Sequence, residues 1–140
     1  MDASQNPYQS PKSSVTDISH SEGEKLTFKQ IWFSFEGRIP RKVFWLYSLL
    51  MIVPVAVIFG VAAAISPKLM VVVAIPTYIA IIWISFAIQI KRWHDRDKSG
   101  WWVLIGFVPV IGGLWALIEN GFLRGSEGEN RFGGDATGLY

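Results

Sequence analysis

The 140-residue sequence contains no cysteine and few charged residues. Without cysteine, the chain has neither disulfide bonds nor thiolate ligands for a metal ion. Charged residues make up only 17% of the chain, whereas 51% of the residues are hydrophobic and 14% are aromatic, which is unusually apolar for this length. Lys68 is the only charged residue between Val43 and Ile90. Because a soluble fold needs polar side chains on its surface, this composition favours an integral membrane protein.

Three apolar blocks have roughly the length of a transmembrane helix. They lie at 43–65, 69–90 and 101–118. About 20 helical residues cross the hydrocarbon core of a bilayer, whereas the buried helices of soluble proteins contain shorter apolar segments. We therefore predict an all-α integral membrane protein with three transmembrane helices. Pro109, Gly112 and Gly113 interrupt the third block, so a re-entrant hairpin is the alternative there.

The chain begins with a polar segment, and its composition changes near Leu26. Residues 1–24 are rich in Ser, Asp, Glu, Asn, Gln and Pro. Such a segment cannot bury enough apolar surface to offset the loss of conformational entropy, which predicts a disordered N-terminal tail. Residues 25–140 form the predicted membrane domain.

A short amphipathic helix is predicted just before the first apolar block. Phe28, Ile31, Trp32 and Phe35 have the spacing of one helical face, and Thr27 can cap the helix. Such a helix either lies in the plane of the membrane interface or packs on the transmembrane helices, and the sequence allows both.

Two polar motifs flank the first two blocks. The first, FEGRIPRKVFW, begins at Phe35, and the second, KRWHDRDKSGWW, begins at Lys91. In the first motif a glycine and a proline permit a turn into the membrane, with basic side chains at the level of the lipid head groups. The second motif carries more ionisable side chains than a connecting loop needs. The candidate site residues of the two motifs are Gly37, Arg38, Arg41, Arg92, His94, Asp95, Asp97, Ser99, Gly100 and Trp101.

Metal binding and catalysis are both disfavoured for these residues. His94, Asp95 and Asp97 carry donor atoms that suit divalent ions, but the basic residues around them oppose a cation. Acid–base chemistry by His94 with Asp95 would need a nucleophile, and Ser99 is the only hydroxyl nearby. We therefore expect no metal site, no cofactor and no catalytic residue.

Ion pairs between the two motifs explain these charges better. Arg38 or Arg41 can bond Asp95 or Asp97, which would satisfy charges that lie close to hydrocarbon and would lock the helices together. The alternative is that the same basic patch binds an anionic lipid head group or a protein partner.

The distribution of lysine and arginine predicts the orientation of the chain. These residues are concentrated before the first block and in the second motif, whereas Lys68, Arg124 and Arg131 lie elsewhere. Cytoplasmic segments carry the excess of basic residues, so the N-terminus and the second motif are predicted to be cytoplasmic. With three spans the C-terminus is then outside, and Glu119 either lies at the outer interface or projects into a polar interior of the helix bundle. With a re-entrant third block the C-terminus returns to the cytoplasm.

The two motifs, together with GENRFG at 128–133, resemble the bacterial domain of unknown function 805 (DUF805). That family consists of small inner-membrane proteins with an F-x-GR-x-x-R-x-x-FW motif, an RR-x-HD-x-x-x-SGWW motif and a G-x-N-x-[FY]-G motif. The resemblance covers roughly Thr27 to Gly134. Lys91 stands where the family usually has arginine, so a bidentate contact at that position is lost. The resemblance implies a multi-pass protein of the bacterial inner (plasma) membrane and assigns no activity.

Two classes of function fit the sequence. The first is a non-catalytic membrane component, structural or lipid- or partner-binding, with a basic cytoplasmic face. The alternative is one subunit of a small oligomeric channel or carrier. Small residues at Gly60 and 62–64 permit close contact between helices in either case. The expected partners are membrane lipid, including lipid with anionic head groups, a second copy of the chain or another membrane protein. No nucleic acid is expected to bind.

Overall fold

The computed structural model describes residues 23–140, so the tail predicted to be disordered lies outside the described residues, apart from its last two positions. The described part is helical, with one isolated bridge between Asn130 and Gly133 and no strand. Its elements are the α-helices α1 (Phe28–Phe33), α2 (Arg41–Leu50), α3 (Ile52–Ile65) and α4 (Pro67–Asp95), the 3-10 helix η1 (Gly100–Phe107), the α-helix α5 (Ile111–Leu117) and the π-helix η2 (Ile118–Phe122).

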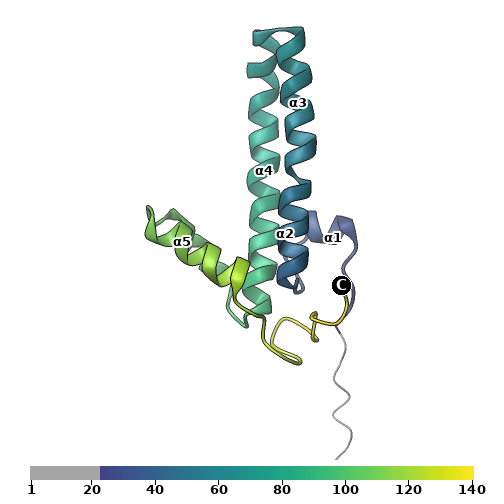
Figure 1. Ribbon diagram of the computed structural model, residues 1–140, viewed down its shortest axis with the longest axis vertical. Coiled ribbons are helices and arrows are strands. Elements are labelled where there is room, and N and C mark those ends of the chain that lie inside the picture. Colours follow the sequence, from purple (N-terminus) through teal and green to yellow (C-terminus); the bar gives the residue numbers. More distant parts are fainter. Residues whose placement is uncertain (1–22) are drawn as a thin grey trace, which may run out of the picture.

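Two long helical segments lie side by side and run antiparallel (Figure 1). α2 and α3 together cover Arg41–Ile65 with 25 residues, and α4 covers Pro67–Asp95 with 29 residues. At about 1.5 Å per residue they are roughly 37 Å and 43 Å long, against a hydrocarbon core of about 30 Å. Both are long and apolar enough to cross a membrane, as predicted for the first two blocks. α4 continues beyond the predicted end at Ile90, so much of the second motif lies on a helix.

The break and the turn within this pair follow from local sequence. The chain breaks between Leu50 and Ile52, one turn before Pro54. A proline ring clashes with the carbonyl group four residues earlier, which places the break here. At the far end the Ser66 hydroxyl caps α4, and Pro67 occupies the first helical position, where its missing N–H costs nothing.

The outer surface of the helix pair is apolar. Ile52, Val71 and Ile75 are 59%, 67% and 67% exposed, and many other large apolar side chains of α3 and α4 are similarly exposed. A continuous apolar surface of this extent is unstable in water and is expected where side chains contact lipid. The pair is therefore built as the transmembrane part of the protein.

The third apolar block does not form the continuous helix predicted for 101–118. η1 runs outward from the foot of α4, the chain turns at residues 108–110, and α5 returns against η1. Figure 1 shows this hairpin leaving α4 at an angle. A Cβ atom on Gly112 would lie 1.8 Å from the Ile105 carbonyl oxygen, so only glycine permits the close approach of the two arms. The predicted third span is not confirmed, and the block has the form of the alternative hairpin.

The C-terminal segment lies at the same end of the pair as α1 and the start of α2 (Figure 1). The Leu26 amide donates a hydrogen bond to the Tyr140 hydroxyl oxygen at 2.7 Å, and Arg38 donates to the carbonyl oxygens of Gly128 and Gly133. The hairpin thus returns the chain to the end from which it left, and this arrangement does not support the predicted placement of the C-terminus on the opposite side from the pre-span segment.

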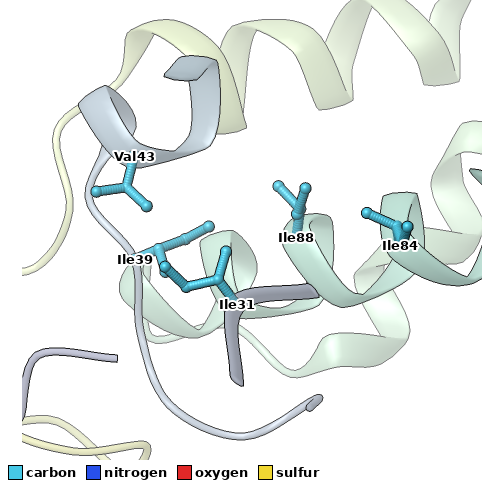
Figure 2. Close-up of a cluster of buried hydrophobic side chains, with 5 residues drawn as sticks. All are labelled: Ile31, Ile39, Val43, Ile84 and Ile88. Atoms are coloured by element: carbon cyan, nitrogen blue, oxygen red, sulfur yellow. The ribbon is translucent and has the colours of Figure 1, made fainter. Parts of the chain in front are cut away.

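A small apolar core joins α1 and α2 to α4 at this end. It contains Ile31, Ile39, Val43, Ile84 and Ile88, all at most 8% exposed, and Figure 2 shows these side chains converging. The burial of Ile31 means that α1 packs on the helix pair, one of the two placements left open by its sequence. The predicted cap is confirmed: the Thr27 hydroxyl accepts from the Gln30 amide, and the Gln30 side chain accepts from the Thr27 amide.

Candidate functional site

Asp95, the last residue of α4, is the centre of a buried polar network. Its side chain is 2% exposed. Oδ1 accepts hydrogen bonds from the Arg38 Nε and Nη2 atoms at 3.3 and 3.2 Å, and Oδ2 accepts from Arg92. One carboxylate therefore holds two guanidinium groups from different motifs, and charge-assisted bonds of this kind are among the strongest in proteins. The predicted ion pair between the two motifs is present as Arg38–Asp95.

Arg38 also holds the C-terminal segment. Its Nη1 atom donates to the Gly128 carbonyl oxygen at 2.7 Å and to that of Gly133 at 3.0 Å, and Nη2 donates to the Ser126 carbonyl oxygen at 2.7 Å. The residue is only 4% exposed. Its guanidinium is thus saturated within the protein and leaves no donor for a ligand.

Arg92 and Lys91 hold the two neighbouring segments. Arg92 donates from Nε to the Asn120 carbonyl oxygen at 2.7 Å and also bonds the Leu123 carbonyl oxygen, so it anchors the returning arm of the hairpin. Lys91 donates from Nζ to the carbonyl oxygens of Ile31, at 3.0 Å, and Ser34, so it holds the end of α1. Both side chains are fully buried. All three contacts of the Lys91 ammonium group are with carbonyl oxygens, for which arginine's bidentate geometry is not needed.

His94 lies between the first motif and the C-terminal segment. Its Nδ1 atom is 3.2 Å from the Gly37 carbonyl oxygen, and its ring stacks on Phe132 with 3.8 Å between ring centroids and 3° between planes. Gly37 has a φ of +88°, a conformation that favours glycine, and this conformation orients its carbonyl group. These contacts join residues from all three motifs of the sequence.

Two further ion pairs surround this network. Arg131 pairs with Asp97 at 3.1 Å, where both side chains are about half exposed or more. Glu119 accepts from Arg96 at 3.1 Å and from Lys98 at 2.7 Å. Glu119 therefore lies at the foot of α4 rather than at the far interface where a third span would have placed it. Burial would raise the pKa of the Glu119 carboxyl, but hydrogen bonds and charge from Lys98 and Arg96 outweigh it and hold the pKa below its usual value.

The remaining predicted site residues lie at the edges of the network. Arg41 pairs with neither Asp95 nor Asp97 and donates to the Phe122 carbonyl oxygen at 3.1 Å. The Ser99 hydroxyl oxygen caps η1 by accepting from the Trp101 amide at 3.5 Å. Trp101 is 78% exposed, and Gly100 begins η1 beside His94.

Several residues of the network carry no recognisable signal in the sequence. Ser126 donates from its amide to the Asp95 carbonyl oxygen at 2.7 Å, and the Asn130 side chain donates to the His94 carbonyl oxygen at 2.8 Å. A Cβ atom on Gly125 would lie 2.0 Å from Asp95 Oδ2. Asn130 belongs to the third motif, but Gly125 and Ser126 precede it, and only the folded chain brings them to Asp95.

The arrangement favours structure over catalysis. Asp95 is engaged by two arginines and does not orient His94, and the Ser99 hydroxyl caps a helix. No group of three or more His, Asp or Glu side chains with the geometry of a metal site occurs among residues 23–140. The network therefore serves to hold charges in a buried place, and its buried charged side chains Arg38, Lys91, Arg92 and Asp95 are all bonded within the chain.

A small cavity with basic side chains in its walls adjoins this network at the start of α2. Its volume is about 110 Å³, and its walls include the cations Arg41, Lys42 and Arg124, the acidic residue Asp95, and Thr137 and Tyr140 from the C-terminal segment. Lys42 makes no ion pair within the described part of the chain, and Arg124 pairs only with Glu127, at the surface. In contrast with Arg38, Lys91 and Arg92, these cations remain accessible.

Comparison with known proteins agrees with the sequence motifs. The model of a family described as proteins of unknown function (DUF805) matches residues 32–134. The chain is 33% identical over 113 residues to the Escherichia coli inner membrane protein YhaI, with 79% of this chain and 92% of the relative covered. It is 32% identical over 112 residues to the inner membrane protein YhaH of the same organism, with 74% and 88% covered, and 30% identical over 134 residues to its uncharacterized protein YiiR, with 79% and 90% covered. No solved structure matches the chain.

Proposed function

Because the chain belongs to the DUF805 family, two of whose E. coli relatives are named as inner membrane proteins, we propose that it is a non-catalytic component of the bacterial inner membrane that binds anionic lipid through a basic cytoplasmic face. The observation that carries this proposal is the division of its cations into two sets. Arg38, Lys91 and Arg92 are buried and bonded internally, whereas Arg41, Lys42 and Arg124 surround a cavity that is open to a ligand.

The proposed topology has two spans and a re-entrant hairpin, with both ends of the chain cytoplasmic. Lys68 lies at the turn between the two long helices. Every other lysine and arginine among residues 23–140 lies at the opposite end, with the Asp95 network. This asymmetry is the one that the positive-inside rule associates with the cytoplasm.

The polar network supports this role by holding the hairpin and the C-terminal segment in place. Arg92 anchors the hairpin, Arg38 anchors the C-terminal segment, and Asp95 joins the two. The walls of the basic cavity come from the start of α2, from Asp95 at the end of α4 and from the C-terminal segment, so the network that joins these segments shapes the cavity. A phosphate group there would meet up to three cations, while Asp95, the acidic residue of the walls, is already paired with Arg38 and Arg92. Juxtamembrane basic residues attract anionic lipid with about 1 kcal/mol each.

Lipid-dependent thermal unfolding of the purified protein in detergent tests the binding. Phosphatidylglycerol should raise the midpoint of wild-type unfolding by about 2–5 °C, whereas neutral phosphatidylcholine should not. Replacing the two helix cations, Arg41→Gln with Lys42→Gln, should remove most of this shift. Lys29→Gln on α1, outside the cavity, is the matched control and should keep it. An equal shift in the double variant and the wild type would exclude the cavity as the binding site.

Reporter fusions test the topology. A reporter that is active only in the cytoplasm should be active after Tyr140, and one that is active only outside should be active when inserted after Ser66. Activity of an external reporter at Tyr140 would contradict the two-span arrangement. Ion flux across liposomes that contain the purified protein would favour the channel or carrier instead of a binding component.

A further inference from the structure

A large apolar cleft lies between α4 and the first arm of the hairpin, apart from the basic cavity. Its volume is about 760 Å³, within the range of small-molecule binding sites. α4 contributes residues from Ile79 to His94, and η1 contributes Trp101 and Leu104. Ile79 and Trp101 are 63% and 78% exposed, so the cleft opens sideways, toward the lipid that surrounds the helix pair.

One end of the cleft is polar, and His94 supplies an acceptor there. Its Nδ1 atom faces the Gly37 carbonyl oxygen, which can only accept, so in the neutral ring the proton is on Nδ1 and Nε2 is an acceptor. A Cβ atom on Gly100 would lie 3.3 Å from Nε2 and 2.8 Å from Ile90 Cγ2, so glycine keeps the space beside Nε2 open. Stacking on Phe132 holds the ring in this orientation.

Ser99 supplies a donor at the same end. Its oxygen accepts from the Trp101 amide, which leaves its own hydrogen free to donate. The neighbouring cation, Lys98, is held by Glu119. The polar end thus offers one acceptor and one donor without an uncommitted charge, which matches a hydroxyl group and not a phosphate.

The length of the cleft suits a single hydrocarbon chain. Ile79 and His94 lie about 22 Å apart along α4 at the usual rise. One hydrocarbon chain along α4 fits this length and places its head near His94.

We propose that this cleft binds a neutral lipid with one long hydrocarbon chain and a free hydroxyl group, such as a monoacylglycerol, with the hydroxyl bonded to His94 Nε2 and Ser99. The chain lies against Trp83, Phe86 and Leu104. This site differs from the basic cavity in place and in chemistry, since it recognises a hydroxyl without a charge.

Photocrosslinking of the full-length protein in phosphatidylcholine nanodiscs tests the proposal. The probe is a monoacylglycerol whose acyl chain carries a diazirine and an alkyne, and the labelled peptides are mapped by mass spectrometry. Labels should concentrate on residues 79–104. Monoolein should compete at least about fivefold to tenfold better than methyl oleate, which has the same chain without a hydroxyl, because the hydrogen bonds to His94 and Ser99 are lost.

A matched pair of variants tests the position of the chain. Leu104→Trp fills the cleft and should lower labelling at least about fivefold. Leu114→Trp makes the same change on the exposed surface of α5, outside the cleft, and should leave labelling unchanged. The wild-type competition decides the hydroxyl contact even if the Leu104 variant fails to fold.

Three results would overturn the proposal. Equal competition by methyl oleate would exclude recognition of the hydroxyl. Labels spread evenly over α3, or equal labelling of the two tryptophan variants, would exclude the cleft. Absence of label from residues 79–104 in nanodiscs that hold two copies of the chain would show that a second protein, and not lipid, occupies the cleft.

Discussion

Along the helix pair, Ile52, Val71 and Ile75 point away from the protein and are more than half exposed, whereas at the foot of α4 the charged residues Arg92 and Asp95 are almost completely buried. A soluble protein has the opposite distribution. Lipid solvates the apolar side chains of the pair without specific contacts. It cannot satisfy buried charges, so the protein must supply their partners itself. The two regions should therefore respond very differently to substitution.

The largest effect is expected at Asp95. Asp95→Ala leaves the guanidinium groups of Arg38 and Arg92 buried without their carboxylate, which typically costs about 3–5 kcal/mol. Reversible unfolding in mixed micelles measures this loss. In a double-mutant cycle, Arg38→Ala should add less in the Asp95→Ala background than in the wild type. Strictly additive losses would show that the pair does not couple the two motifs.

A smaller loss is expected from a single methyl group at Gly125. Its Cβ would overlap Asp95 Oδ2, so Gly125→Ala must displace either the Asp95 side chain or the backbone segment that carries Ser126. We expect this to lower the free energy of unfolding by about 1–3 kcal/mol. Gly138→Ala is the control in the same C-terminal segment, since a Cβ there meets nothing within 4 Å. Unfolding free energies of the two variants in the same detergent give the comparison. Equal stability would contradict the close packing at Asp95.

Glu119 should make stability depend on pH in the acid range. Its folded-state pKa lies below the unfolded value, so its contribution is present above the unfolded pKa and is lost as pH falls through the folded pKa. The stability difference between wild type and Glu119→Gln should therefore shrink between about pH 6 and pH 3. Unfolding series at several pH values measure it. A constant difference would mean that the ion pairs with Arg96 and Lys98 do not lower the pKa.

The smallest effect is expected at the exposed pair of Arg131 and Asp97. Solvent and salt screen it, so Arg131→Gln should cost at most about 1 kcal/mol, and less at high ionic strength. The same micelle unfolding assay, with and without salt, measures it. A loss as large as that of Asp95→Ala would contradict the expected difference in strength between the buried network and the exposed ion pair.

Sequence reasoning was accurate where the signal is local. The lengths of the first two blocks predicted the two long helices, and Thr27 predicted the cap of α1. The third block is equally apolar, so its length alone suggested a span. Pro109 and Gly112 indicated that the block could turn back instead. In the structure, Gly112 lies where the two arms of the hairpin approach too closely for any side chain.

The candidate site was only partly predictable, because its contacts join residues that lie far apart in the sequence. Opposite charges in two motifs suggested Arg38 with Asp95, but Arg41 and Asp97 looked equally suitable and have other partners. Most acceptors for Arg38 and Lys91 are backbone carbonyl oxygens, which every residue has. No sequence pattern marks which of them will point toward a cation.

The sequence by itself determined that the chain is a membrane protein with two long apolar helices and that its charges gather at one end, because solvation by lipid depends on composition and length. Only the tertiary structure decided that the third block folds back, that both ends of the described chain meet beside Asp95, and which cations remain accessible. These outcomes depend on hydrogen bonds, whose strength requires atoms from distant segments to come within about 3 Å in the right direction.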